Sequence, residues 1–190
     1  MTDYGLSRIY TPEDGRKMGL EGMIEDMMEE AGAVTPGKHL AGSLEGLKKA
    51  DNADLARFIT ALELGVLPKS HLDAIRALAD DRVKAPVLGI TGTGGAGKSS
   101  LTDELILRFR LFSDEPKIAV IAIDPSRRRS GGALLGDRIR MNAISSPDIF
   151  MRSLATRDSK TEVPEALDDI VLCCQAAGFD LIIVETPGIG

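Results

Sequence analysis

A glycine-rich segment with one lysine and one serine at its end could hold a phosphate group. "GTGGAGKS" matches the pattern GxxxxGK[ST] in full. Its glycines let consecutive N–H groups point inward at phosphate oxygens, and the positive end of the following helix adds to the attraction. A plain turn between strand and helix would not call for Lys98 and Ser99. The pattern predicts a nucleotide-binding loop made of Gly92, Thr93, Gly94, Gly95, Ala96, Gly97, Lys98, Ser99 and Ser100.

Carboxylates that could face a magnesium ion follow two apolar runs. Asp124 ends "KIAVIAID" and Glu185 ends "LIIVE", and ligands of open α/β sheets sit at the carboxyl ends of the strands. Asp137, in "GGALLGDRIRM", follows a loop rich enough in Gly and Ser to fold over a nucleotide. We predict a metal site made of Ser99, Asp124, Asp137 and Glu185. Asp124, which precedes a proline, could instead cap the next turn.

The closing segment "ETPGIG" suggests how the site would sense the nucleotide. Glu185 stands where many P-loop GTPases carry Asp-x-x-Gly, an acid that holds the metal through water and a glycine whose N–H contacts the γ-phosphate. We read the segment as a turn with Gly188 as the sensor. The predicted reaction is in-line attack of water on the γ-phosphate, with Lys98, Glu185 and Gly188 as the catalytic residues.

The elements that position these residues read as an α/β fold. "VLGIT", "KIAVIAID" and "LIIVET" are continuous, β-branched-rich runs separated by helix-like stretches, and a further short strand, "DIFMRSL", is expected between the second and the last along the chain. Strands of this kind predict a mostly parallel sheet covered by helices on both faces. Residues 85–190 would form this domain.

Two further zones precede it. Residues 34–84 are helical by pattern, with an apolar stripe at Leu55, Phe58, Ile59 and Leu62 and a capping box from Ser70 to Asp73. Residues 1–33 offer a β-like run "SRIYT", a Pro-Glu-Asp-Gly turn and a Met-rich helix that ends at Gly32, with its methionines as packing residues. One strand and one helix cannot bury themselves, so this zone is expected to be the end of something larger.

Composition narrows the class of partner. The 190 residues carry a net charge of −6 and two adjacent cysteines, Cys173 and Cys174. An acidic chain is not expected to bind nucleic acid or a membrane surface, and no apolar run approaches the length of a membrane span. The start of the chain lacks the layout of a signal peptide, so we expect a reducing, cytoplasmic setting. The basic run Arg127–Arg129 could stabilise transferred charge or dock an acidic partner, but most such runs are simply solvated.

Three motifs together resemble one family. "GITGTGGAGKSSL", "AIDPSRRRSGGALLGDRIRM" and "LIIVETPGIG", in this order, are similar to the MeaB/ArgK family of P-loop GTPases, which are chaperones of cobalamin-dependent acyl-CoA mutases. The likeness covers about 34–190, where the first part resembles the helical N-terminal extension of that family. It implies GTP and GDP as ligands, Mg²⁺ held by the four residues above, and "PSRRRSGGALLGD" as a mobile switch. The motif that would set guanine preference would lie beyond Gly190.

The first zone adds a second resemblance. "SRIYTPEDGRKMGLEGMIEDM" looks like the last strand and helix of a flavodoxin-like cobalamin-binding domain. That order of domains occurs in the fused isobutyryl-CoA mutases, so the chain would be an internal piece, cut soon after Gly188. This resemblance implies a mutase domain and a cobalamin-binding domain as partners, adenosylcobalamin as a cofactor of the parent protein only, and a homodimer.

Other hypotheses stay open. A metal-insertion GTPase for nickel enzymes shares the architecture but usually shows Cys or His ligands near the nucleotide, whereas the only histidines here are His39 and His71, both in the helical zone. A small-molecule kinase would need an acceptor pocket and a lid. A non-catalytic module that only binds nucleotide, or only joins flanking domains, is the alternative from a different class.

Overall fold

The computed structural model describes residues 8–33, 42–124, 141–156 and 163–188. The chain divides into two compact units, residues 1–39 and 40–190. The boundary expected between 84 and 85 falls inside the second unit.

Among residues 8–33, the described part of the first unit, there is one helix, α1 (Pro12–Ala33), which bends at Gly19. Thr11 caps it, because its hydroxyl accepts from the Asp14 amide and its own amide donates to the Asp14 carboxylate. The predicted Pro-Glu-Asp-Gly turn is therefore wrong, since these residues form the first helical turn, with Pro12 at the position that tolerates proline best. The strand expected in "SRIYT" is also wrong for residues 8–11, and the helix continues past Gly32.

Leu20, Ile24 and Met27, three large apolar residues of α1, are exposed. The sequence predicts that a helix of this zone cannot bury itself, and the role of its methionines in packing stays a prediction. A polar cluster lies on the same unit: the Tyr10 hydroxyl donates to the Asp26 carboxylate at 2.6 Å, and Arg8 pairs with that carboxylate at 2.9 Å. The hydrogen bond to Asp26 raises the pKa of Tyr10.

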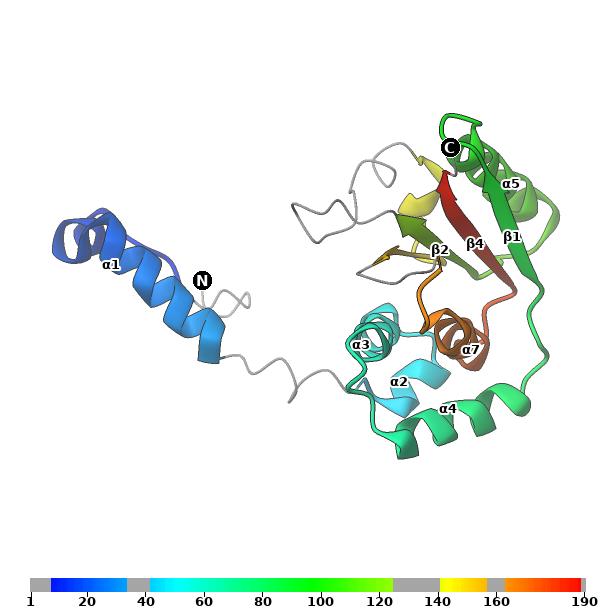
Figure 1. The fold of residues 1–190 in the computed structure, drawn as a ribbon, viewed down its shortest axis with the longest axis horizontal. Helices are drawn as coiled ribbons and strands as arrows, with labels where there is room; N and C mark the ends of the chain where they lie inside the picture. Colours follow the sequence, from blue (N-terminus) through cyan, green and yellow to red (C-terminus); the bar gives the residue numbers. More distant parts are fainter. Residues whose placement is uncertain (1–7, 34–41, 125–140, 157–162, 189–190) are drawn as a thin grey trace. The chain divides into compact units, whose positions relative to one another are not determined.

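The second unit is built on a sheet of four parallel strands (Figure 1). Their order across the sheet is β1-β4-β2-β3, with bounds β1 (Val87–Gly92), β2 (Ile118–Asp124), β3 (Ile149–Ala155) and β4 (Leu181–Gly188). Each of the four strands predicted within residues 85–190 is present, and all pair in parallel. The register places Glu185 between Ile90 of β1 and Ala122 of β2, so the acid lies in the middle of the sheet's carboxyl edge.

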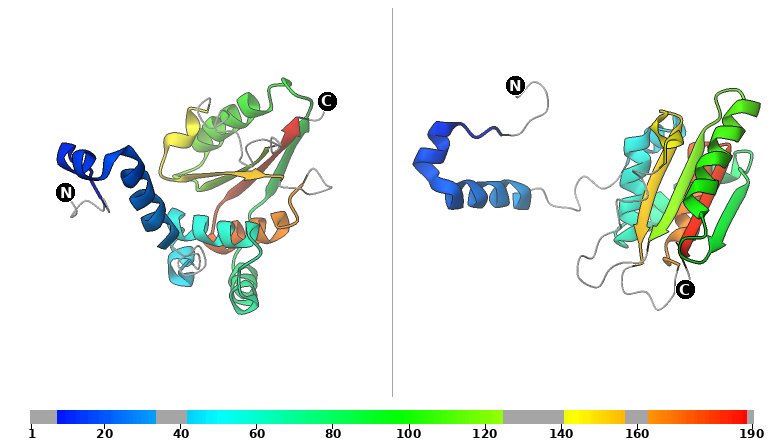
Figure 2. Two further views of the ribbon diagram at one scale, coloured as in Figure 1. Left: turned by 60° about the vertical axis from the view of Figure 1, so that its left-hand side comes forward. Right: turned by 90° about the horizontal axis from the view of Figure 1, so that it is seen from above.

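Helices cover both faces of this sheet, which confirms the predicted α/β class (Figure 2). One face carries α5 (Lys98–Phe112) and the short 3₁₀ turn η2 (Ala143–Ser145). The other face carries α2 (Leu44–Lys48), α3 (Asn52–Glu63), α4 (Lys69–Asp80) and α7 (Leu167–Ala177). Each layer shares a hydrophobic core with the strands it covers, so both position the loops at the carboxyl edge.

The helices before the sheet are part of its core. Leu55, Phe58 and Ile59 are fully buried, which confirms the predicted stripe on α3. The capping box predicted at Ser70 is wrong, because α4 begins at Lys69 with the extended Pro68 as its N-cap and no side-chain cap. Pro68 has the backbone that a cap requires, so Ser70 falls inside the first turn.

A polar link also ties α3 to the sheet. The Arg152 guanidinium on β3 donates to the Glu63 carboxylate at 2.6 Å and to the Thr60 hydroxyl at 3.0 Å. The Glu63 side chain is largely buried and that of Arg152 is half-buried. Because these bonds join β3 to the last turns of α3, the end of α3 is held against the sheet as well as packed on it.

Strand β1 departs from the expectation of two covered faces. Its residues Val87 and Leu88 are exposed, whereas β2 is buried along its whole length. Within the described part of the chain, β1 has a hydrogen-bonded neighbour on one side alone, β4. The sequence pattern of β1 is that of an interior strand, and the described residues leave it at an edge.

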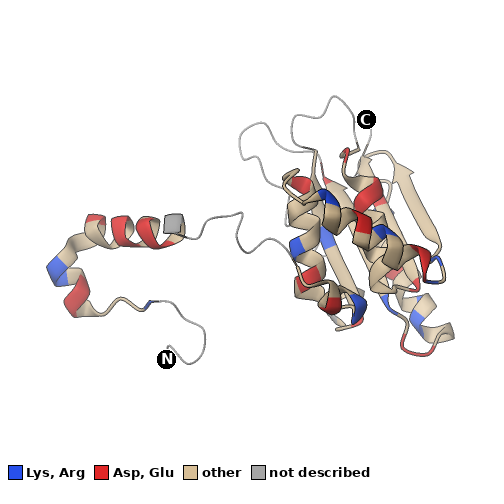
Figure 3. Cartoon of the chain, turned by 90° about the horizontal axis from the view of Figure 1, so that it is seen from below, with Lys and Arg blue, Asp and Glu red and all other residues tan. Residues whose placement is uncertain are grey.

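The surface carries charges of both signs. Lys and Arg alternate with Asp and Glu over the helices of residues 40–190, while carboxylates predominate along α1 (Figure 3). None of the helices in the described residues has the length and apolarity to cross a membrane.

Candidate nucleotide site

The glycine-rich segment forms a loop between β1 and α5, as its pattern predicts. Gly95 and Gly97 have φ of 75° and 83°, a backbone conformation that favours glycine. Gly97 is the N-cap of α5 and brings no side chain to the helix end. The first amides of α5 are therefore left for a ligand, at the positive end of a 15-residue helix.

Lys98 lies across this loop. Its ammonium donates to the carbonyl oxygens of Gly92 and Thr93, at 3.1 and 3.2 Å. These bonds hold the ammonium beside the loop amides, so an anion bound there would contact both the ammonium and the amide N–H groups. Lys98 therefore stabilises the conformation of the loop and also places a positive charge beside it.

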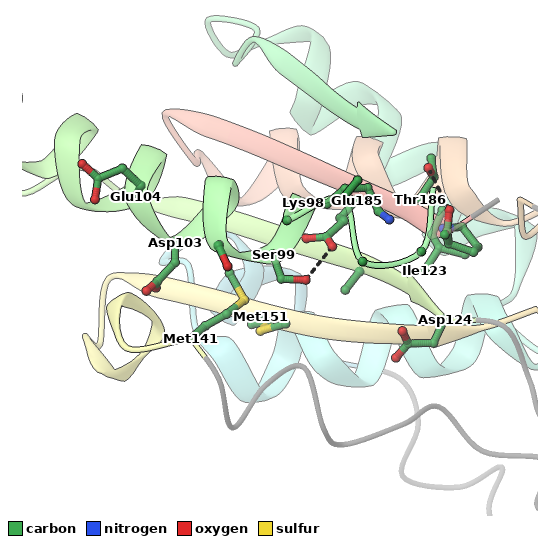
Figure 4. A pocket seen from close by; sticks show the side chains of 18 of the residues that line it. Lys98, Ser99, Asp103, Glu104, Ile123, Asp124, Met141, Met151, Glu185 and Thr186 are labelled. Carbon is green, nitrogen blue, oxygen red and sulfur yellow. Dashed lines mark hydrogen bonds between the residues drawn. The ribbon is translucent and has the colours of Figure 1, made fainter. Parts of the chain in front are cut away.

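Two side chains from distant parts of the sequence meet at the carboxyl edge. The Ser99 hydroxyl, on the first turn of α5, donates to Oε1 of Glu185 at 2.7 Å (Figure 4). Glu185 is 8% exposed, so the carboxylate is held within the protein and faces the loop. The structure therefore brings together the two predicted metal ligands that are furthest apart in the sequence.

A pocket of about 760 Å³ opens in front of this pair, a size typical of small-molecule sites. Asp124, at the end of β2, lines it too (Figure 4). The predicted loop, metal and catalytic residues that line the pocket are Gly94, Gly95, Ala96, Gly97, Lys98, Ser99, Ser100, Asp124, Glu185 and Gly188. Gly92 and Thr93 instead supply the carbonyls that hold Lys98.

Strand β4 does not end at the acid. Residues 185–188, predicted as a turn, continue the strand, and Gly188 pairs with Gly92 of β1. A Cβ on Gly188 would lie 2.7 Å from Cα and 2.8 Å from N of Gly94, so only glycine lets the two segments approach this closely. The strand continues here because pairing with β1 satisfies backbone groups that an isolated turn would leave without hydrogen bonds.

Sequence reasoning missed two residues that support the site. Thr102 is fully buried, and its hydroxyl lies 3.1 Å from Oε2 of Glu185. Asp103 lines the pocket and accepts a hydrogen bond from the Ala143 amide at 2.8 Å. The signal for Thr102 was its spacing, since a residue three positions after Ser99 lies on the same face of a helix.

Asp137, the Arg127–Arg129 run and the predicted switch segment that contains them lie outside the described part of the chain. The assignment of individual residues to nucleotide and metal stays a prediction. The strand, loop and helix that carry them define a P-loop nucleotide-binding domain with a carboxylate facing the phosphate loop.

Comparisons with known proteins give the family. The sequence model described as methylmalonyl-CoA mutase-associated GTPase MeaB matches residues 55–190. The chain is 57% identical over 188 residues to a fused isobutyryl-CoA mutase of Cupriavidus metallidurans, covering 98% of the chain and 17% of the relative. It is 35% identical over 157 residues to the GTPase ArgK of Escherichia coli, covering 80% of the chain and 46% of that protein.

A solved structure agrees with these matches. The crystal structure of an LAO/AO transport system kinase is similar with a TM-score of 0.54 at 31% identity, over 80% of this chain and 44% of that one. The chain belongs to the MeaB family of GTPases. It spans about a sixth of the length of the fused mutases that it matches.

Proposed function

We propose that this chain binds and hydrolyses GTP with the help of Mg²⁺, as the G-protein chaperone region of a cobalamin-dependent acyl-CoA mutase. The observation that carries the proposal is the pairing of Ser99 with Glu185 in front of the phosphate loop. A hydroxyl and a buried carboxylate at this place are the protein ligands that a magnesium-bound triphosphate needs.

The donor set fits magnesium. The described residues contain no group of three or more His, Cys, Asp or Glu side chains that could hold a metal. Mg²⁺ does not require such a group, because it is bound through one or two carboxylates together with substrate phosphates and water. Ser99 and Glu185 would hold it, with Asp124 at the same pocket and Asp137 as a further predicted ligand. When bound, Mg²⁺ supplies electrostatic stabilisation of the phosphate oxygens.

The remaining roles would fall to the phosphate loop, Lys98 and Gly188. The amides of residues 94–99 and the Lys98 ammonium would bind the phosphates and stabilise the charge that develops as water attacks the γ-phosphate in line. Gly188, packed on Gly94, would report whether the γ-phosphate is present. These roles require the loop and the end of β4 to keep their mutual position, which the pairing of Gly92 with Gly188 supports.

The mutase role comes from the relatives. Proteins named fused isobutyryl-CoA mutase match nearly the whole chain. We infer that the partners are a mutase domain and a cobalamin-binding domain, that the assembly is a homodimer, and that GTP turnover gates the loading of adenosylcobalamin and protects the mutase. Transfer of adenosylcobalamin to the mutase, followed by absorbance in the presence of GTP and of GDP, tests this role; equal transfer with both would remove it.

The nickel-type alternative finds little support. Cys173 and Cys174 are buried in α7, and burial raises the pKa of Cys173 to about 12. Both lie in the hydrophobic core that α7 shares with the sheet, and neither lines the pocket. These two side chains are therefore core residues of a helix and not a metal site beside the nucleotide.

Hydrolysis of GTP by the wild-type chain and by Lys98→Ala tests the enzymatic part of the proposal. We expect the substitution to lower the rate about 10²-fold or more, because it removes a preorganised charge from the transition state. Equal rates would remove the catalytic function from this chain and leave the non-catalytic binding module. Failure of GTP to displace ATP would instead contradict the guanine preference.

A further inference from the structure

We propose that Thr102 is a positioning residue, which orients the Glu185 carboxylate for the magnesium ion; the inference rests on the proposed function. Thr102 has no exposed surface. Its hydroxyl lies 3.1 Å from Oε2 of Glu185, while Ser99 donates to Oε1 at 2.7 Å. Two hydroxyls from one helix therefore hold the two oxygens of one carboxylate.

The hydroxyl of Thr102 has a second acceptor within reach, which is the Lys98 carbonyl at 3.0 Å. A hydroxyl has one proton and donates to one acceptor at a time. In an α-helix the carbonyl at Lys98 is already the partner of the Thr102 amide, and a bond to a carboxylate is the stronger of the two. The Thr102 hydroxyl therefore donates its proton to the Glu185 carboxylate.

The identity of the acid explains why such a contact is needed. A glutamate has one more rotatable bond than an aspartate at the same place, and it loses more side-chain freedom when its carboxylate is fixed. Glu185 is buried between β1 and β2. A bond from Thr102 to Oε2 removes the remaining rotation and leaves Oε1 facing Ser99. Metal ligands are commonly oriented by such outer contacts.

The test is the magnesium dependence of nucleotide binding, measured with fluorescent GDP and with GTP on the full chain. In Thr102→Val the hydroxyl is lost and the β-branched shape is kept. We expect the Mg²⁺ concentration at half-maximal binding to rise about 10- to 100-fold. Binding without Mg²⁺ should stay unchanged, and saturating Mg²⁺ should restore turnover. Thr102→Ser keeps the hydroxyl and should behave as the wild type.

Thr60 provides a matched control. It lies on α3, and its hydroxyl likewise has the carbonyl four residues before it, that of Ala56, within reach at 2.8 Å, but it does not line the pocket. Thr60→Val should leave the magnesium dependence unchanged. Thr102→Ala, which lacks the hydroxyl and is smaller, should shift the magnesium dependence in the same direction as Thr102→Val, so the inference does not depend on one variant folding well.

The outcomes separate the inference from the proposed function. A wild-type chain whose nucleotide binding ignores Mg²⁺ would overturn both. A wild-type chain that requires Mg²⁺, with Thr102→Val and Thr102→Ala showing the same requirement, would overturn the role of Thr102 alone. A shift in Thr102→Ser as large as that in Thr102→Val would also overturn it, because the effect would then not follow the hydroxyl.

Discussion

Replacing Gly188 by alanine should damage the phosphate loop as well as the predicted γ-phosphate sensor. The added methyl would lie 2.7 Å from Cα of Gly94, about 0.7 Å short of the 3.4 Å at which ordinary contact begins. The opposing atoms are backbone, so either the loop or the end of β4 must move. Gly188 does not have a positive φ, and the effect is therefore one of space.

The size of the effect follows from overpacking, which costs about 1–3 kcal/mol in a well-packed region. For a chain of this length that corresponds to a melting temperature lower by about 2–12 °C. Because Gly94 lines the pocket, the shift should weaken GDP and GTP together. A residue that only sensed the γ-phosphate would weaken GTP and spare GDP.

Thermal unfolding by circular dichroism and binding of fluorescent GDP and GTP measure both effects. Gly89→Ala is the control, since Gly89 lies on the same strand as Gly92 and an added Cβ there meets nothing within 4 Å. It should melt no lower than the wild type. Gly188→Ala with an unchanged melting temperature and unchanged GDP affinity would refute the reasoning from packing.

Three further substitutions test other parts of the structure. Glu63→Ala leaves the Arg152 guanidinium without its carboxylate and should lower the free energy of unfolding by about 1–3 kcal/mol, measured in urea. Asp103→Ala removes the acceptor of the Ala143 amide and should speed hydrogen exchange of that amide. For Cys173, burial raises the pKa from 9.0 to about 12. Between these pH values the unfolded thiol loses its proton and the native thiol keeps it. The contribution of Cys173 to the free energy of unfolding is therefore complete below pH 9 and falls as the pH rises towards 12.

A matched comparison accompanies each of these substitutions. Asp80 pairs with Lys84 at 3.9 Å on the surface, and Asp80→Ala should change the free energy of unfolding by under about 1 kcal/mol. If Glu63→Ala lowered it no more than Asp80→Ala does, burial of the pair between Glu63 and Arg152 would not account for its effect. Asp103→Asn keeps an acceptor oxygen and should protect the Ala143 amide better than alanine does. For Cys173→Ala, the free energy of unfolding in urea should fall less steeply between pH 8 and 10 than it does for the wild type. Identical slopes against pH would contradict the raised pKa of Cys173 as the cause.

The sequence was sufficient for the sheet and the phosphate loop, because both depend on local patterns. Continuous β-branched runs at residues 118–124 and 181–184 specify buried parallel strands, and glycine with positive φ specifies the loop. The meeting of Ser99 and Glu185 was also predictable, since strand ends converge at one edge of a parallel sheet.

Long-range contacts account for what the sequence did not reveal. Residues 185–188 look like a turn because Pro187 and Gly188 favour one, yet pairing with β1 makes them strand. Thr102 looks like an ordinary helical threonine, and only the fold brings the Glu185 carboxylate within reach of its hydroxyl. At the start of α1, Thr11 caps the helix and Pro12 is its first residue, where the sequence predicted the end of a strand and the start of a turn.

The central claim is that the loop before α5 binds a magnesium nucleotide. Isothermal titration of GTP into the wild-type chain and into Lys98→Ala, each with and without Mg²⁺, measures this most directly. The account predicts magnesium-dependent binding by the wild type and an affinity about 10²-fold lower, or lost, in Lys98→Ala, because a charge-assisted contact to phosphate is removed. Equal affinities in the two chains, or no binding by the wild type, would contradict it.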